Sequence, residues 1–157
     1  MRLKIRDARD EDADQLIALI AACYAEYEGC VLDVEAEVPE LRTIASTHAE
    51  VGGRFWVAES DGRIIACAGF VPAANGTIEM KKLYVSKEAR RMGLARKLVS
   101  LVEIEAMSRG ARSIELWSDT RFEDAHRLYA GRGYKRGETR DLNDLSASTE
   151  YYFRKDL

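Results

Sequence analysis

The segment from Glu79 to Leu98 constrains the fold of this chain more than any other. Its first residues, as far as Val85, have the composition of a β-strand, its middle is short and rich in arginine, and from Gly93 it has the spacing of an amphipathic helix. The amides in the first turn of a helix have no partner within the helix, and the helix dipole makes that end positive. A strand that leads into a helix through small and basic residues therefore predicts a binding site for an anion.

The remaining pattern predicts one domain over residues 1–157 with a mixed α/β fold. The chain has 157 residues, of which 46% are hydrophobic and 32% charged, and its two prolines mark no linker. Leu3 and Ile5 indicate a first strand, and Asp10 is expected to cap a helix of about fifteen residues. Further helices are expected at 40–48, 93–109 and 123–131, and strands at 55–59, 64–71, 78–85 and 113–117, before a closing hairpin.

Composition and charge exclude several classes of protein. The formal net charge of −3 argues against a nucleic-acid-binding protein and against a protein that coats anionic membranes. No apolar run approaches the roughly 20 residues of a membrane span, and the N-terminus carries no apolar signal core, so a cytoplasmic location is expected. The three cysteines form neither a CxxC pair nor a disulfide framework, so no metal site is expected. Basic residues gather in one window, which indicates a focused anion site or a solvated face: Lys81, Lys82, Lys87, Arg90, Arg91, Arg96 and Lys97.

The strand expected at 78–85 contains an irregularity. A regular strand alternates strictly by two positions. The apolar positions here are spaced by two, three and two: Ile78, Met80, Leu83 and Val85. One extra residue near Lys81 and Lys82 restores the alternation, which is the signature of a β-bulge. A bulge would bend this strand away from the strand at 113–117 and open a slot between them. The alternative interpretation is that the sequence only changes from polar to apolar residues at Lys82 and Leu83, which would open no slot.

Two motifs resemble those of the GNAT superfamily of N-acetyltransferases. The first is Leu83-Tyr84-Val85 followed by Arg90-Arg91-Met92-Gly93-Leu94-Ala95, which is similar to the family's acetyl-coenzyme A motif. The second is Ala125-His126-Arg127-Leu128-Tyr129 with Gly133-Tyr134 after it, at the separation that the family has. The resemblance extends from Phe55 to Tyr134. It implies the GNAT acyl-CoA N-acyltransferase fold, a central and mostly antiparallel sheet flanked by helices, in which the strands at 78–85 and 113–117 splay apart.

The resemblance also implies acetyl-coenzyme A (acetyl-CoA) as the cosubstrate, without a metal. Pantetheine would lie in the slot along the backbone of the bulged strand, and the pyrophosphate would lie on the amides of the arginine-rich loop. The residues expected to bind it are Leu83, Tyr84, Val85, Arg90, Arg91, Met92, Gly93, Leu94, Ala95 and Arg96. The chain departs from the family pattern at Phe122, where many members carry asparagine, so Thr120 or Arg121 would have to replace that contact.

Two residues are candidates for the proton transfers that the reaction needs. Glu79 precedes the bulge on the same strand, and it would take a proton from an acceptor amine with a pKa near 10, directly or through a water. Its alternative role is a surface or cross-strand charge paired with a lysine. Tyr129 matches the family's general-acid position. A phenol with a pKa near 10 stays protonated at neutral pH and can donate to the departing thiolate. Its alternative role is an aromatic residue packed on a helix face.

The acceptor is the least constrained part of the prediction. Tyr24 and Tyr27 lie in the region where the family builds its acceptor pocket, and Asp119 ends a strand where it would bind an amine or cap the next element. The sequence thus predicts an acetyl-CoA-dependent N-acetyltransferase, a monomer or homodimer. It would transfer the acetyl group directly to a primary amine of a small molecule or amino-acid-like acceptor. A non-catalytic acyl-CoA sensor and a protein or peptide N-acetyltransferase are the alternatives.

Overall fold

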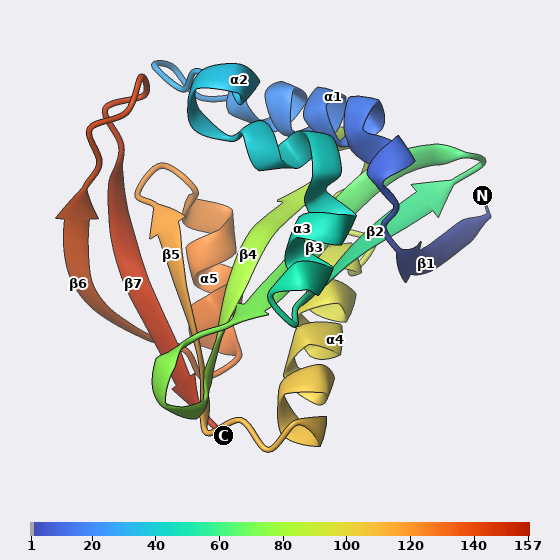
Figure 1. Cartoon of the computed structure of the whole chain (residues 1–157). Helices are drawn as coiled ribbons and strands as arrows, with labels where there is room; N and C mark the ends of the chain where they lie inside the picture. The colour runs from blue at the N-terminus through green and yellow to red at the C-terminus, as the bar shows by residue number, and fades with distance from the viewer. Residues whose placement is uncertain (1) are drawn as a thin grey trace.

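The computed structural model describes residues 2–157, and a mixed sheet of seven strands forms its centre (Figure 1). The spatial order of the strands is β1-β2-β3-β4-β5-β7-β6. Every neighbouring pair is antiparallel except β4 and β5, which are parallel. The mixed, mostly antiparallel sheet predicted from the sequence is therefore confirmed. The strands are β1 (Leu3–Asp7), β2 (Arg54–Ser60), β3 (Arg63–Pro72), β4 (Thr77–Val85), β5 (Ser113–Asp119), β6 (Lys135–Asp141) and β7 (Thr149–Asp156).

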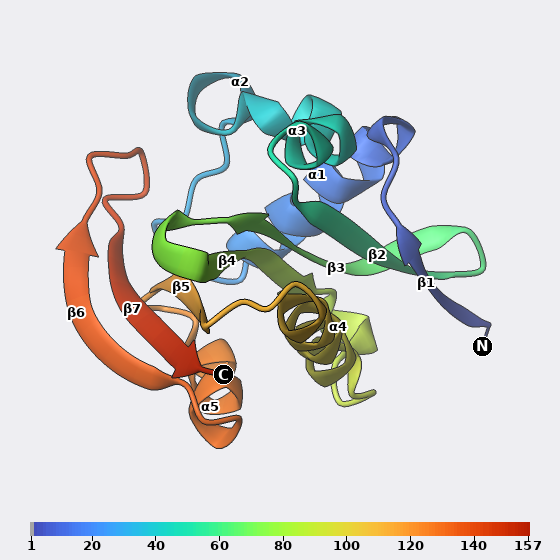
Figure 2. The same ribbon diagram turned by 60° about the horizontal axis from the view of Figure 1, so that its bottom comes forward.

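Helices cover both faces of the sheet (Figure 2). The N-terminal helices α1, α2 and α3 lie on one face, and α4 and α5 lie on the other. The α-helices are α1 (Ala13–Tyr24), α2 (Val34–Glu37), α3 (Ile44–Glu50), α4 (Leu94–Ser108) and α5 (Glu123–Gly131). Short 3₁₀ turns precede α1 (Asp10–Asp12), precede α3 (Pro39–Thr43), join β3 to β4 (Ala74–Gly76) and follow β4 (Lys87–Ala89). No helix among the described residues is both long and apolar enough to cross a membrane.

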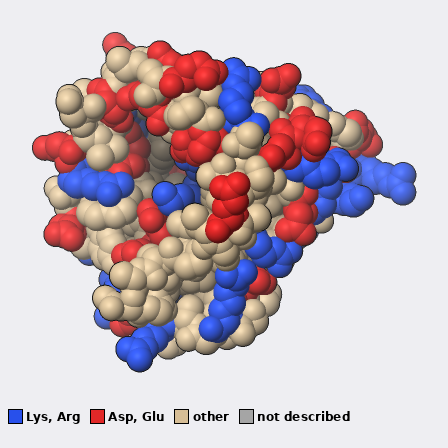
Figure 3. Space-filling model, viewed as in Figure 1, with Lys and Arg blue, Asp and Glu red and all other residues tan. Residues whose placement is uncertain are grey.

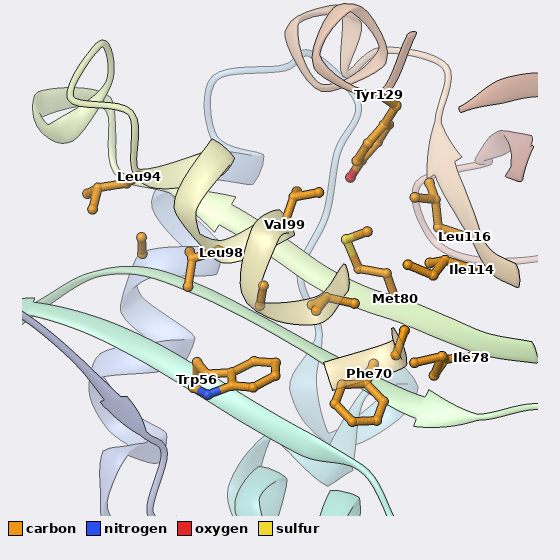
Figure 4. Packing of buried hydrophobic residues seen from close by; sticks show 14 of the residues in the cluster. Trp56, Phe70, Ile78, Met80, Leu94, Leu98, Val99, Ile114, Leu116 and Tyr129 are labelled. Atoms are coloured by element: carbon orange, nitrogen blue, oxygen red, sulfur yellow. The ribbon is translucent and has the colours of Figure 1, made fainter. Parts of the chain in front are cut away.

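The sheet separates two apolar clusters, one under each helical layer. The larger cluster fills the space between the sheet and helices α4 and α5, and Figure 4 shows Leu98 and Val99 of α4 packed near Trp56, Phe70 and Met80. The smaller cluster joins α1 and α3 to the other face. Because both faces of β3 are covered, this strand is an almost continuous buried run, as is typical of a central strand.

Several local signals in the sequence are explained by the structure. The predicted helix stop at Gly110 is confirmed, because Gly110 is left-handed (φ 71°) and the amide of Ala111 donates to the carbonyl of Ala106 at 3.0 Å, as in a Schellman motif.

The predicted capping role of Asp10 is wrong. Its carboxylate instead accepts hydrogen bonds from the amide and hydroxyl of Ser46, at 3.0 and 2.6 Å, and so joins the first helical segment to α3.

A buried charge network links α4 to the C-terminal strands. The Glu103 carboxylate on α4 accepts hydrogen bonds from the Arg132 guanidinium, from the Tyr134 hydroxyl at 3.0 Å and from the Lys155 ammonium at 3.0 Å. Glu103 is itself buried. The network therefore fixes α4, and with it the loop that precedes this helix, against β7 and the end of α5.

The irregularity predicted in the third strand of the meander is a β-bulge, and it lies at the predicted place. On β4, Lys81 pairs with Gly69 and Tyr84 pairs with Cys67, so Lys82 and Leu83 together oppose one residue of β3. The parallel pairing between β4 and β5 ends at Glu79, which pairs with Glu115. Beyond that point the two strands separate, and both openings described next lie along this gap.

Candidate active site

The loop before α4 presents free backbone amides to an open cleft. The first helical hydrogen bond runs from the amide of Lys97 to the carbonyl of Gly93 at 3.1 Å, so the amides of the first turn have no acceptor within the helix. Both Arg91 (φ 68°) and Gly93 (φ 77°) are left-handed, which turns the loop sharply into the helix. A Cβ added at Gly93 would meet no atom within 4 Å, so the space over this glycine is free for a ligand.

The cleft in front of this loop has a volume of about 700 Å³ and lies between the end of β4, the start of α4 and α5. Nine of the ten residues predicted to bind the cosubstrate line it: Leu83, Tyr84, Val85, Arg90, Arg91, Gly93, Leu94, Ala95 and Arg96. The tenth, Met92, does not line the cleft and packs against the larger apolar cluster. The basic loop, the helix N-terminus and the bulged strand therefore converge on one opening.

The arginines of the loop differ in what they contact. Arg90 donates to both carboxylate oxygens of Glu26, each at 2.6 Å, and to the carbonyl of Val85 at 3.2 Å, so its guanidinium fastens the loop to the region after α1. Within the described chain, Arg91 and Arg96 make no ion pair, and both are exposed. These two side chains are therefore the ones free to meet an anion in the cleft.

A second opening, of about 360 Å³, lies on the other side of the bulge. We call it the inner cavity. It shares four lining residues with the cleft, which are Leu83, Tyr84, Phe122 and Ala125. Both candidate proton-transfer residues, Glu79 and Tyr129, line the inner cavity, together with Tyr24 and Asp119. Tyr27, also predicted to contact the acceptor, lines the cleft instead.

Phe122 marks the junction of the two openings. Its ring packs against Tyr27 at a centroid distance of 5.1 Å, against Tyr84 at 6.3 Å and against Tyr24 at 6.4 Å. Where many family members are expected to place an asparagine, this chain places the centre of an aromatic cluster. The cluster joins α1 to the segment after β5 and borders both the cleft and the inner cavity.

Arg121 and Asp119 form a closed pair beside the inner cavity. The Asp119 carboxylate accepts from the amide of Arg121 at 2.9 Å and from its guanidinium at 3.2 Å, as a residue that caps the next turn does. The same guanidinium donates to the Cys30 sulfur at 3.0 Å and to the carbonyl of Ser146 at 2.6 Å. Arg121 therefore holds the inner cavity's wall and does not line the cleft.

Tyr129 is a buried residue of α5 whose ring packs against Phe153 at 5.4 Å and Tyr134 at 5.7 Å. Figure 4 shows its hydroxyl directed away from α5 into the cluster. The hydroxyl makes no hydrogen bond to any other part of residues 2–157. Burial raises the pKa of this phenol well above its usual value, so it stays protonated at neutral pH.

Glu79 lies on β4 immediately before the strands separate. Its side chain is 26% exposed, and its nearest cation is the Lys81 ammonium at 3.9 Å. That separation is longer than a hydrogen bond, so the carboxylate keeps its acceptor capacity toward the inner cavity. Glu79 and Tyr129 reach the inner cavity from strand β4 and from helix α5, respectively.

Two loops meet over the inner cavity. The loop after α1 and the loop between β6 and β7 lie side by side in Figure 1. The Ser146 hydroxyl accepts from the amide of Val31 at 2.8 Å and donates to its carbonyl at 3.1 Å. The amide of Leu145 donates to the Glu37 carboxylate at 3.0 Å. These hydrogen bonds connect the β6–β7 loop to the loop after α1 and to the end of α2, and the connected segments form a roof over one side of the inner cavity.

The inner cavity is acidic overall. Six of its lining residues are acidic and three are basic, namely Asp33, Glu37, Glu79, Asp119, Asp144 and Glu150 against Lys81, Lys82 and Arg140. Figure 3 shows this face of the molecule hollowed beside the β6–β7 hairpin, with acidic side chains around the rim. No group of three or more His, Cys, Asp or Glu side chains in residues 2–157 is arranged to hold a metal ion.

Comparison with known proteins agrees with this geometry. The structure of a GNAT acetyltransferase from Staphylococcus aureus Mu50 matches with a TM-score of 0.85 at 21% identity, over 99% of each chain. The PaiA N-acetyltransferase from Thermoplasma acidophilum in complex with coenzyme A matches with a TM-score of 0.74 at 17% identity, over 100% of each chain. The fold is therefore that of an acetyltransferase with a bulged and splayed sheet.

The sequence comparison identifies the family. The model of the acetyltransferase (GNAT) family matches residues 14–134, and the chain belongs to this family. A probable N-acetyltransferase 14 from Xenopus tropicalis is 31% identical over 121 residues, which are 76% of this chain and 58% of that protein. The chain spans about half the length of the curated relatives it matches.

Proposed function

We propose that this protein is an acetyl-CoA-dependent N-acetyltransferase that transfers the acetyl group directly to a primary amine of a small molecule or amino-acid-like acceptor. One observation carries the proposal. The cleft at the α4 N-terminus and the inner cavity meet at the β4 bulge, and a carboxylate and a protonated phenol line the inner cavity. A ligand held in the cleft can thus present a reactive end to a second ligand in the inner cavity.

The cleft has the chemistry that coenzyme A requires. The free amides of the first turn of α4 and the unpaired guanidinium groups of Arg91 and Arg96 suit a pyrophosphate. The left-handed Gly93 leaves room for the phosphates over the helix end. Beyond Glu79 no residue of β5 pairs with β4, so this edge of the bulged strand is open for an extended arm such as pantetheine. The coenzyme, when bound, supplies the acetyl group as a thioester.

The side chains of the inner cavity supply the proton transfers. Glu79 accepts the proton that the acceptor ammonium must lose before its nitrogen becomes a nucleophile, directly or through a water. Burial raises the pKa of Tyr129, so its hydroxyl keeps its proton at neutral pH and is available to donate a hydrogen bond or a proton to the leaving thiolate. The amine attacks directly, so no nucleophilic side chain of this chain is required.

The roof over the inner cavity favours a small acceptor over a peptide. A peptide needs a groove that is open at both ends, whereas Ser146, Leu145 and Arg121 link the loops that border this cavity. The volume of about 360 Å³ lies at the lower end of the range for small-molecule sites. The excess of acidic lining residues suits an acceptor that enters as a cation.

A panel of amines tests the proposal. We expect thiol release from acetyl-CoA, followed with a thiol reagent, in the presence of small primary amines, and no release above background with peptides. Tight acetyl-CoA binding without thiol release with any acceptor would contradict the enzymatic role and support a sensor. Release with peptides alone would contradict the small acceptor.

A further inference from the structure

Lys82 occupies an unusual position in the bulge of β4. Its backbone is left-handed (φ 56°), a conformation that costs a residue with a side chain about 1 kcal/mol. Strained residues of this kind are concentrated at functional sites. The side chain is only 20% exposed, and it lines the inner cavity. A strained backbone therefore places Lys82 in the wall of the candidate acceptor site, with its ammonium group near Glu40.

Among the described residues, the Lys82 ammonium has one ion-pair partner, the carboxylate of Glu40. Its nearest carboxylate is that of Glu40, at 3.6 Å, which is beyond hydrogen-bond distance. Over residues 2–157 it makes no hydrogen bond, although an ammonium carries three donors. Burial and the neighbouring Lys81 lower its pKa, while Glu40 opposes that change. An additional anionic group beside Lys82 would therefore be stabilised.

The charged groups of the inner cavity come from different elements. Both lysines lie on the bulged strand, as does Glu79, whereas the carboxylates of Asp33, Glu37 and Asp144 come from the segments around α2 and from the β6–β7 loop. These three carboxylates form no ion pair within the described chain. A ligand with an anionic and a cationic group would match this arrangement better than a simple amine.

We propose that Lys82 binds an anionic group of the acceptor, a carboxylate or a phosphate, so that the substrate is an amine that also carries an acid group. This inference rests on the proposed function, because it names the substrate class of the same site. Lys82 is then a specificity-determining residue. Glu40 competes with the acceptor's anionic group for the same ammonium.

The competing explanation is that Lys82 and Glu40 form a structural pair that holds the turn before α3 on the sheet. The two explanations predict opposite effects of Glu40→Gln on the activity toward acidic acceptors. If the pair is structural, Lys82→Gln and Glu40→Gln impair the protein in the same way. If Lys82 binds the acceptor, Lys82→Gln weakens acidic acceptors, whereas Glu40→Gln strengthens them because it removes the competing carboxylate.

The experiment compares matched amines on the full chain with saturating acetyl-CoA. Each amino acid is paired with the amine formed by its decarboxylation, and phosphoethanolamine is paired with ethanolamine, so that the arms separate carboxylates from phosphates. We expect kcat/KM for the acidic member of a pair to exceed that for its partner. In Lys82→Gln this preference falls about 10- to 100-fold, the factor that one charge-assisted hydrogen bond supplies. In Glu40→Gln it rises. Lys4→Gln, an exposed lysine of β1, is the control and leaves the preference unchanged.

A binding measurement gives an independent readout. Calorimetric titration of the coenzyme A complex with the same pairs should show the same loss in Lys82→Gln. An unchanged preference in Lys82→Gln, or a parallel loss in Lys82→Gln and Glu40→Gln, overturns the role of Lys82 while leaving the acetyltransferase proposal in place. Absence of thiol release with every amine overturns both proposals.

Discussion

Replacement of Tyr129 by phenylalanine separates the catalytic role of this residue from a packing role. The ring fills a site bordered by Phe153 and Tyr134, with centroid distances of 5.4 and 5.7 Å, and phenylalanine keeps that ring. The hydroxyl has no hydrogen-bond partner in residues 2–157 that its removal would leave unsatisfied. We therefore expect the free energy of unfolding to change by less than about 1 kcal/mol.

The expected effect on turnover is much larger. Loss of a general acid costs about 10²- to 10⁴-fold in rate, or about 2.7 to 5.5 kcal/mol of activation free energy. Because burial raises the pKa of Tyr129, the phenol of the wild-type protein stays protonated from acidic to mildly alkaline pH. Its loss should therefore lower kcat by a similar factor throughout that range.

The assay is thiol release from acetyl-CoA at saturating acceptor, with the cosubstrate Kd measured separately by calorimetry. We expect kcat to fall while Kd changes less than about threefold, because Tyr129 lines the inner cavity and not the cleft. A variant whose kcat stays within about twofold of wild type would show that Tyr129 is only a packed aromatic residue. Urea unfolding of the same variant checks that the fold is retained.

Two further predictions address the base and the network behind α4. Glu79→Gln keeps the size of the side chain but removes the base, so kcat/KM should fall about 10²-fold or more at neutral pH. Recovery of kcat/KM at alkaline pH, where the acceptor amine is already neutral, would support the role of Glu79 as the base. A pH profile of kcat/KM equal to that of the wild-type protein would contradict it. Burial opposes ionisation of Glu103, but hydrogen bonds from Arg132, Lys155 and Tyr134 outweigh it and hold its pKa below the usual value. That stabilisation is present at neutral pH and is lost as the pH falls below about 4.3, the pKa of an unperturbed glutamate. Glu103→Gln should lower the free energy of unfolding by about 3 kcal/mol at pH 7 and make this free energy less sensitive to acid pH. Urea unfolding at several pH values measures both effects. An equal change of the unfolding free energy with pH in the variant and the wild-type protein would contradict this prediction.

The elements that position the cleft were predictable because their signals are local. The bulge follows from the spacing of Met80 and Leu83, and the end of α4 follows from Gly110, since each depends on residues close in sequence. The short helix α2 was not predicted, because four residues carry too little periodicity to distinguish a helix from a polar loop.

Contacts between residues far apart in the sequence depend on tertiary structure, so the sequence pattern does not specify them. Arg90 was expected at the anion, yet its guanidinium meets Glu26, a residue 64 positions away. The roof joins Val31 to Ser146 across 115 positions, and neither residue belongs to a motif. The expectation that Asp10 caps the first helix was wrong for the same reason, because its partner Ser46 comes from a distant helix.

The central claim is that the N-terminus of α4 holds the phosphates of coenzyme A, and calorimetry on variants of Gly93 tests it most directly. In Gly93→Glu a carboxylate enters the space over the free amides, where the structure shows no atom within 4 Å of the added Cβ. Gly93→Ala is the matched control, because it carries the same cost of a left-handed backbone without the charge. If two charge-assisted hydrogen bonds are lost, at about 1.5 to 3 kcal/mol each, affinity falls about 10²- to 10⁴-fold.

We therefore expect acetyl-CoA to bind the wild-type protein, to bind Gly93→Ala with a small loss of affinity, and to bind Gly93→Glu at least about 100-fold more weakly, while all three unfold cooperatively in urea. Equal affinity of Gly93→Glu and Gly93→Ala for acetyl-CoA would contradict the assignment of the anion site.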